Sequence, residues 1–380
     1  MDIHKQKHWC IQNMAILLRP SRMLIPLLLI LQFSANTANS LHTHSISPSL
    51  PPTQLLLRTL AAPINPADIN QIQGVYPSKP PFTSLLGTSQ PSAVAGNEAC
   101  FQVVSVGSSI KSVQKGDWVI MKNTGFGTWR THALAEEKDI LRVEKEGLTE
   151  VQAATVGVNP TTAYRMLKDF EGLEGGRDWF IQNGANSGVG RAAIQLGREW
   201  GYNSINIIRD RKTPEETDAM RNELKELGAT EVLTESELQS RDGMGKIKEW
   251  TQGKHLKLGL NCVGGPQTLA LTKTLSQAGH LVTYGAMSKQ PLSVPTGLLI
   301  FKDIKFSGFW VSRWSDAHPE EKKKTVDEIL QMTREKKFKD IPVQELKWDW
   351  DTEGPTLTKA IAGTLEGFRS GKGVLVFGDT

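Results

Sequence analysis

The sequence predicts a two-domain α/β fold, in which a doubly wound parallel sheet is inserted into a mainly β domain. Three observations support this fold class. The 380 residues exceed what one hydrophobic core holds, since single cores rarely grow past ~250 residues. The first part of the chain contains short strand-like segments with few helices, whereas strands and helices alternate after residue 159. Such alternation produces a parallel sheet through right-handed crossovers.

Composition places the chain among globular proteins and excludes several functional classes. Apolar residues make up 39% and charged residues 22% of the chain, which argues against a disordered protein. The net charge of +4 and the lack of a basic stripe with interleaved aromatics argue against nucleic-acid binding. Three separated cysteines and no H-E-x-x-H motif give no pattern for a disulfide framework or a zinc site, so we assign no metal.

Residues 1–40 differ in composition from the rest of the chain. Four basic residues precede an apolar run at 23–33, and Asp2 is the one acid before Asp68. The run is shorter than the ~20 residues that span a bilayer, so we expect no stable membrane insertion. A basic start followed by an apolar stretch fits a secretory signal, and acid-poor basic composition fits an organelle transit peptide equally well.

Strand patterns in the first part of the chain define the mainly β domain, which we assign to residues 41–157. The patterns lie at 53–60, 100–106 and 118–121. The Pro-rich segment 77–91 is predicted to be a loop.

Six further strand patterns define the parallel sheet, and they lie at 178–182, 204–209, 231–233, 258–261, 280–284 and 304–308. A helix pattern at 190–201 connects the first two strands. Six strands at this spacing describe a complete Rossmann domain, which we assign to residues 158–315. A charged helix at 320–336 and a strand at 371–377 then predict that residues 316–380 return to the first domain.

The turn after the first parallel strand is a candidate phosphate site. The segment 178–190 runs from a strand through a tight turn into a helix, and a helix N-terminus presents free N–H groups to an anion. Only Gly190 matches the G-x-G-x-x-G pattern, with Gly188 beside it. An ordinary glycine-rich turn is the alternative interpretation.

The second parallel strand ends in Arg209-Asp210-Arg211. An NAD enzyme places an acid at this point against the ribose 2′-hydroxyl. Two permanently charged guanidiniums instead suit a 2′-phosphate, which they can bind bidentately. We therefore predict NADPH as the cofactor, and surface ion pairing within the triplet is the alternative.

Tyr76 is a candidate proton donor. The chain has four tyrosines, and Tyr76 lies in a predicted loop of the β-rich domain. Its hydroxyl is protonated at neutral pH and can donate a hydrogen bond or a proton to a substrate. Packing of the ring against Pro77 is the alternative.

Nine short motifs occur together and in order, at 61–70, 73–77, 96–98, 157–160, 186–190, 209–211, 261–265, 283–291 and 308–310. From about residue 41 to the C-terminus the chain resembles the mitochondrial trans-2-enoyl-thioester reductases, zinc-free members of the medium-chain dehydrogenase/reductase superfamily. The resemblance implies a GroES-like catalytic domain carrying the Rossmann domain. It also implies NADPH-dependent reduction of enoyl-CoA or enoyl-acyl-carrier-protein in mitochondrial fatty acid synthesis, by a homodimer located in mitochondria.

The resemblance also implies roles for individual residues. Tyr76 falls on the catalytic tyrosine of the family. The family's cofactor-binding positions fall on Asn159, Asn186, Ser187, Gly188, Val189, Arg209, Asp210, Arg211, Tyr284, Gly285, Ala286, Met287, Phe309, Trp310, Val311 and Lys372.

Two departures from related sequences qualify this interpretation. Zinc-dependent members of the superfamily carry Gly-His-Glu where this chain has Gly96-Asn97-Glu98, and asparagine is a poor zinc ligand. This favours reduction of an activated double bond over metal-assisted alcohol oxidation. Family members also open with a glycine-rich strand–turn–strand unit, but the first glycine here is Gly74. We therefore expect residues 1–40 to be a targeting segment or a misassembled one, without the opening strands.

Two other functions fit the same sequence features. A quinone or enone reductase can use the same fold and cofactor. A non-catalytic NADPH-binding protein can use the fold as an interaction module.

Overall fold

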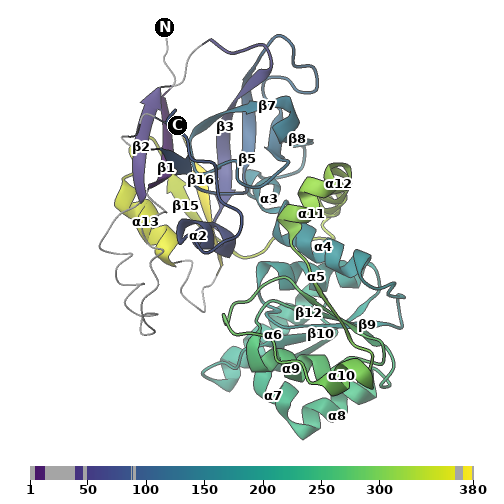
Figure 1. Ribbon diagram of the computed structural model, residues 1–380. Helices are drawn as coiled ribbons and strands as arrows, with labels where there is room; N and C mark the ends of the chain where they lie inside the picture. Colours follow the sequence, from purple (N-terminus) through teal and green to yellow (C-terminus); the bar gives the residue numbers. More distant parts are fainter. Residues whose placement is uncertain are drawn as a thin grey trace. The chain divides into compact units, whose positions relative to one another are not determined.

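The computed structural model describes residues 5–12, 39–45, 49–86, 88, 91–363 and 371–378. The chain forms two compact units: Met1–Gly157 together with Pro342–Thr380, and Val158–Ile341. Each unit has its own sheet system (Figure 1). No helix within the described ranges is both long and apolar enough to cross a membrane.

A seven-stranded sheet forms the centre of the first unit, in the order β15-β16-β3-β5-β6-β8 with β7 paired to β3. Its strands are β3 (Gln54–Pro63), β5 (Cys100–Val106), β6 (Trp118–Met121), β7 (His132–Glu136), β8 (Ile140–Val143), β15 (Val343–Trp348) and β16 (Lys372–Phe377). The helical segments of this unit are α2 (Pro66–Ile72), α3 (Glu150–Thr155), α13 (Gly354–Gly363) and a 3-10 turn (Glu137–Asp139). Trp129, Trp348 and Phe101 are fully buried in its core.

A second sheet of the first unit corrects the expectation that the opening strands are missing. β1 (Lys5–Gln12) pairs antiparallel with both β2 (Asn39–Ser45) and β4 (Ser92–Val94). The expectation relied on the lack of glycine in this segment. Strand pairing, however, uses backbone N–H and C=O groups, which every residue other than proline carries.

The second unit contains a six-stranded parallel sheet in the order β11-β10-β9-β12-β13-β14. The strands are β9 (Trp179–Gln182), β10 (Asn203–Ile208), β11 (Glu231–Thr234), β12 (Leu256–Asn261), β13 (His280–Thr283) and β14 (Lys305–Gly308). β9, the first strand of this sheet in the sequence, is central and the chain winds outward from it in both directions, which is the Rossmann topology. The predicted fold class is confirmed.

The helices of the second unit are α4 (Asn159–Asp169), α5 (Gly188–Glu199), α6 (Pro214–Leu227), α7 (Glu235–Gln239), α8 (Arg241–Trp250), α9 (Gly265–Thr274), α10 (Thr296–Ile300), α11 (Val311–Ala317) and α12 (Pro319–Arg334). Val326, Ile329 and Leu330 form the buried face of α12, which packs against α4 and α11. This packing keeps α12 in the second unit, so the chain returns to the first unit at Pro342 and not at residue 316.

Candidate functional site

The turn between β9 and α5 is built to leave the start of α5 open. Ser187 is the N-cap of α5, and its hydroxyl accepts a hydrogen bond from the Gly190 N–H at 3.1 Å. A Cβ on Gly190 would lie 2.5 Å from the Ala185 carbonyl oxygen. A Cβ on Gly188 would lie 2.5 Å from Nδ2 of Asn159. Glycine at both positions therefore lets the turn pack tightly at the N-terminus of α5, the end of a helix that attracts anions.

Hydrogen bonds tie together the loops that follow β9, β12 and β13. Asn183 donates to Oδ1 of Asn261 at 2.8 Å and accepts from the Cys262 N–H at 2.8 Å. The Met287 N–H donates to the Cys262 carbonyl at 2.9 Å. Because parallel strands end at one edge of a sheet, these bonds place the segment 284–287 beside the turn between β9 and α5.

The hydroxyl group of Tyr284 is buried at this edge of the sheet, although the residue as a whole is partly exposed. Its hydroxyl lies beside Cys262 and Ser187, and burial together with the neighbouring thiol raises the pKa of Tyr284 well above its ordinary value. The phenol is therefore uncharged at physiological pH and can act as a hydrogen-bond donor. A Cβ on Gly285 would come 3.2 Å from the Cys262 carbonyl oxygen, so the chain after Tyr284 also runs close to this loop.

The predicted residues 309–311 follow β14 at the same edge of the sheet. The Phe309 N–H donates to the Thr283 carbonyl at 2.9 Å, and the buried Phe309 ring packs edge-on against Phe170. Trp310 is 37% exposed and precedes α11. The structure therefore gathers the predicted residues of the second unit around the carboxyl ends of β9, β10, β13 and β14.

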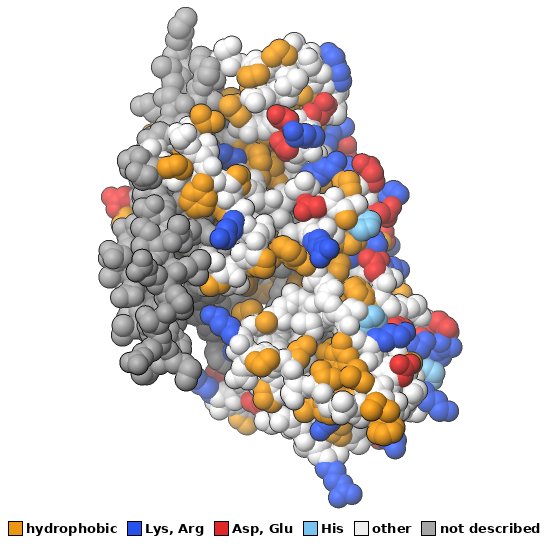
Figure 2. All heavy atoms as spheres, viewed as in Figure 1, with side chains coloured by type: hydrophobic (Ala, Val, Ile, Leu, Met, Phe, Trp, Pro, Cys, Tyr) orange, Lys and Arg blue, Asp and Glu red, His pale blue; other side chains and the backbone are white. Residues whose placement is uncertain are grey.

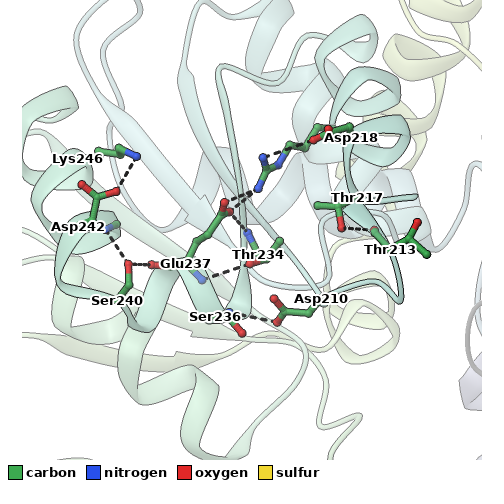
Figure 3. A network of polar contacts seen from close by, with 12 residues as sticks. Asp210, Thr213, Thr217, Asp218, Thr234, Ser236, Glu237, Ser240, Asp242 and Lys246 are labelled. Carbon is green, nitrogen blue, oxygen red and sulfur yellow. Dashed lines mark hydrogen bonds and ion pairs between the residues drawn. The ribbon is translucent and has the colours of Figure 1, made fainter. Parts of the chain in front are cut away.

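Asp210 is held by the N-terminus of α7, which follows β11 directly (Figure 3). Its carboxylate accepts a hydrogen bond from the Ser236 N–H at 3.2 Å. Burial alone would raise the pKa of Asp210, but hydrogen bonds from Thr234 and Ser236 outweigh it and lower the pKa below its ordinary value. Asp210 is thus an anion with protein partners of its own.

A salt bridge and a capping box support the segment that binds Asp210 (Figure 3). Arg221 of α6 donates to both carboxylate oxygens of Glu237, at 2.6 and 2.5 Å. Glu237 also accepts from the Thr234 N–H at 2.7 Å, and the Thr234 hydroxyl accepts from the Glu237 N–H at 3.2 Å. This capping box fixes the start of α7 and, through Ser236, the position of Asp210.

Arg209 and Arg211 flank Asp210 and lie close enough to repel each other. Arg209 is exposed and Arg211 is partly buried. Burial, and then the charge of Arg209, lower the pKa of the Arg211 guanidinium. A bound dianion would relieve this repulsion, because two cations share the same neighbourhood.

The Tyr76 loop of the first unit is anchored to α2. The Tyr76 N–H donates to the Asn70 carbonyl at 3.2 Å. Nε2 of Gln71 donates to the Ser78 carbonyl at 3.1 Å. These two bonds hold both sides of the loop, and Tyr76 itself is partly exposed.

A buried polar cluster adjoins this loop, and sequence reasoning missed most of it. Nζ of Lys372 donates to Oδ1 of Asn65, and Nδ2 of Asn65 donates to Glu98 at 3.1 Å. Burial lowers the pKa of Lys372, while the charges of Glu98 and Asp68 oppose that shift. Lys372 therefore lies in the first unit with two acids near it, whereas the other predicted cofactor residues belong to the second unit.

Comparison with known families supports the division of the chain into two units. Residues 51–145 match the alcohol dehydrogenase GroES-like domain, and residues 188–333 match the zinc-binding dehydrogenase family. The mitochondrial enoyl-[acyl-carrier-protein] reductase of Yarrowia lipolytica is 51% identical over 290 residues, which cover 76% of this chain and 74% of the relative. The chain belongs to the mitochondrial enoyl-[acyl-carrier-protein] reductase family. The predicted resemblance is confirmed, and enoyl-thioester reduction is the activity of this enzyme family.

Solved structures of enoyl-thioester reductases show the same fold. An Etr1p mutant in complex with NADP and crotonyl-CoA superposes with a TM-score of 0.88 and 37% identity, covering 99% of this chain and 100% of that one. The mitochondrial 2-enoyl thioester reductase Etr1p/Etr2p heterodimer from Candida tropicalis gives a TM-score of 0.85, with 37% identity and coverage of 98% and 100%. A relative from Kluyveromyces marxianus is named NADPH quinone oxidoreductase and is 41% identical, covering 78% of this chain and 79% of the relative.

The zinc named in one family description does not fit the residues of this reductase. Across the described part of the chain, no three His, Cys, Asp or Glu side chains group as metal ligands. Asn97, expected from the sequence to replace a zinc-binding histidine, donates from Nδ2 to Asp68 at 2.6 Å. Because this amide donates a hydrogen bond to the neighbouring carboxylate, the two side chains are not arranged as a pair of ligands for a cation.

Proposed function

We propose that this chain uses NADPH to reduce trans-2-enoyl thioesters, as CoA or acyl-carrier-protein esters, to the saturated acyl thioesters. The observation that carries the proposal is the Tyr76 loop, fixed to α2 by hydrogen bonds on both sides of the tyrosine in a chain 51% identical to an enoyl-[acyl-carrier-protein] reductase. Support for the substrate class comes from the Etr1p complex with crotonyl-CoA. The mitochondrial names of the relatives support a role in mitochondrial fatty acid synthesis and a mitochondrial location.

The residues of the second unit fit NADPH. The N–H groups at the start of α5 would bind the pyrophosphate, and Arg209 with Arg211 would bind the 2′-phosphate. Asp210 accepts a hydrogen bond from the Ser236 N–H, so its carboxylate has a partner in the protein beside the proposed phosphate site. Further contacts are proposed for Asn159, for residues 186–189, 284–287 and 309–311, and for Lys372.

NADPH supplies the hydride that adds to the β-carbon of the enoyl group. Negative charge then develops on the thioester oxygen and the α-carbon, and this charge is what the protein must stabilise. The Tyr76 hydroxyl would donate a hydrogen bond to that oxygen, or pass its proton to the α-carbon and regain one from solvent. The net reaction consumes NADPH and one proton and yields NADP⁺ and the acyl thioester.

Replacement of Tyr76 by phenylalanine tests this assignment. Tyr76→Phe removes one hydroxyl and should leave the dissociation constant for NADPH unchanged, while turnover of crotonyl-CoA falls by ~10²- to 10⁴-fold. Cofactor binding is measured by fluorescence titration and turnover by NADPH absorbance. Tyr202→Phe, in the second unit on the ring of Trp200, is the matched control and should keep its turnover. Full activity of Tyr76→Phe would remove Tyr76 from the mechanism.

We also propose that the chain forms a homodimer through β14. This strand is at the edge of the parallel sheet. Exposed apolar side chains lie shortly before it, at the end of α10 (Leu299 and Ile300, 46% and 69% exposed) and at its C-cap (Phe301, 80% exposed). Figure 2 shows apolar side chains gathered on the face of the second unit that carries α10. An unpaired strand edge beside exposed apolar side chains favours pairing with a second copy, and Etr1p and Etr2p assemble as a heterodimer.

NADPH quinone reduction is the second candidate activity. The Kluyveromyces marxianus relative of that name supports it. Quinone reduction also requires NADPH but does not require a proton donor placed for a thioester enolate, so the two activities respond differently to the loss of the Tyr76 hydroxyl.

A further inference from the structure

Asn97 uses nearly all of its hydrogen-bonding capacity inside the first unit. Its Nδ2 donates to Oδ1 of Asp68 at 2.6 Å and to Oε1 of Gln71 at 2.5 Å. Its Oδ1 accepts from the Gly125 N–H at 2.8 Å. The side chain is 8% exposed. A primary amide has two donor hydrogens and one acceptor oxygen, and here all of them have partners.

These bonds connect three segments that are far apart in the sequence. Asn97 precedes β5, Gly125 follows β6, and Asp68 and Gln71 belong to α2. Gln71 continues the connection, because its Nε2 donates to the carbonyl of Ser78, two residues after Tyr76. The path from Asn97 through Gln71 to the Tyr76 loop therefore consists of two consecutive side-chain hydrogen bonds.

We propose that Asn97 is a positioning residue, which fixes the Tyr76 hydroxyl by locking α2 and the loop that follows it. This inference rests on the proposed function, because Asn97 acts through Tyr76.

The charges around Asn97 explain why a neutral amide suits this position. Burial raises the pKa of Asp68 to about 6, against the opposing effects of the Asn65 N–H, Asn97 and Lys372, and with a further upward contribution from Glu98. Aspartate at position 97 would add a third carboxylate to this group. A neutral histidine has one donor and one acceptor, so it could not serve Asp68, Gln71 and Gly125 together.

Double-mutant cycles with Tyr76→Phe test the proposal. Asn97→Ala and Gln71→Met each break the path, and each should lower the kcat for crotonyl-CoA by about 10- to 100-fold, because small misplacement of a reacting group has effects of that size. The dissociation constant for NADPH should stay within about twofold of the parent value, as expected for a positioning effect. In the Tyr76→Phe background the same substitutions should lower kcat by less than twofold, since a loop without its hydroxyl has no proton donor left to misplace.

Gln195→Met is the matched control for the loss of a buried amide. Gln195 accepts from the Lys339 N–H at 2.6 Å and donates to the Lys339 carbonyl at 3.2 Å in the second unit. The Gln195→Met variant should lose about as much thermal stability as the Asn97 and Gln71 variants do, and its kcat should stay unchanged. If Asn97→Ala does not fold, Gln71→Met carries the test alone.

The two hypotheses fail in different ways. A Tyr76→Phe variant with full turnover contradicts the proposed function. If Tyr76→Phe loses turnover but the Asn97 and Gln71 variants keep theirs, or lose it by the same factor in both backgrounds, the positioning role of Asn97 is wrong.

Discussion

At the scale of single residues, the sequence was enough to predict a role for permanently charged side chains. It was not enough to predict which residues far apart in the chain form hydrogen bonds. Arg209 and Arg211 stand at the end of the second parallel strand, where a ligand-binding role can be predicted from their position. The partner of Asp210 is the N–H of Ser236, which is 26 residues away. The same limit applies to Asn65 and Asp68, because apart from the local bond between these two, their partners lie at positions 97, 98 and 372.

The two arginines give a prediction on cofactor preference. In the double variant Arg209→Ala/Arg211→Ala, the preference for NADPH over NADH should fall by about 100-fold, since two charge-assisted contacts contribute about 1.5–3 kcal/mol each and part of this is recovered by solvent. Dissociation constants for both cofactors, measured by fluorescence titration, give the ratio. Lys212→Ala removes a neighbouring exposed cation and should leave the ratio unchanged. Retention of the full preference by the double variant would refute the 2′-phosphate assignment.

At the scale of elements, buried strands were predicted closely and the opening strands were not. The strands Cys100–Val106 and Trp118–Met121 have the predicted bounds, because runs of buried apolar residues mark them. β1 has no such mark, since its sequence Lys-Gln-Lys-His-Trp-Cys-Ile-Gln is mostly polar. α12 was predicted as a helix, but the pattern of one apolar face does not say which unit that face packs against.

The edge strand β14 and the helix α10 carry the prediction on assembly. Sedimentation equilibrium should give twice the chain mass for the parent protein. Phe301→Glu puts a charge on the C-cap residue of α10, which is 80% exposed. It should shift the protein to monomer, because burying an unpaired charge in an apolar interface is costly. Leu85→Glu, at an 85% exposed residue of the first unit, is the control and should remain dimeric. A monomeric parent protein contradicts the proposed interface.

At the scale of the whole molecule, the sequence changes after residue 159 from strand patterns with few helices to alternating strands and helices. This change was enough to predict two structural units and the Rossmann sheet. The order of strands then follows from general rules of parallel sheets. The point of return to the first unit did not follow, because it depends on the packing of α12 against α4 and α11. The proposed function draws on residues of both units, with Tyr76 in one and the turn between β9 and α5 in the other.

The rate of NADPH oxidation with an enoyl thioester and with a quinone, compared in the same preparation, tests the central claim most directly. We expect crotonyl-CoA to oxidise NADPH much faster than menadione does, with butyryl-CoA formed in equal amount, and Tyr76→Phe to abolish most of the crotonyl-CoA rate. Faster oxidation by menadione, with no saturated thioester formed, would contradict the assignment of this chain as an enoyl-thioester reductase.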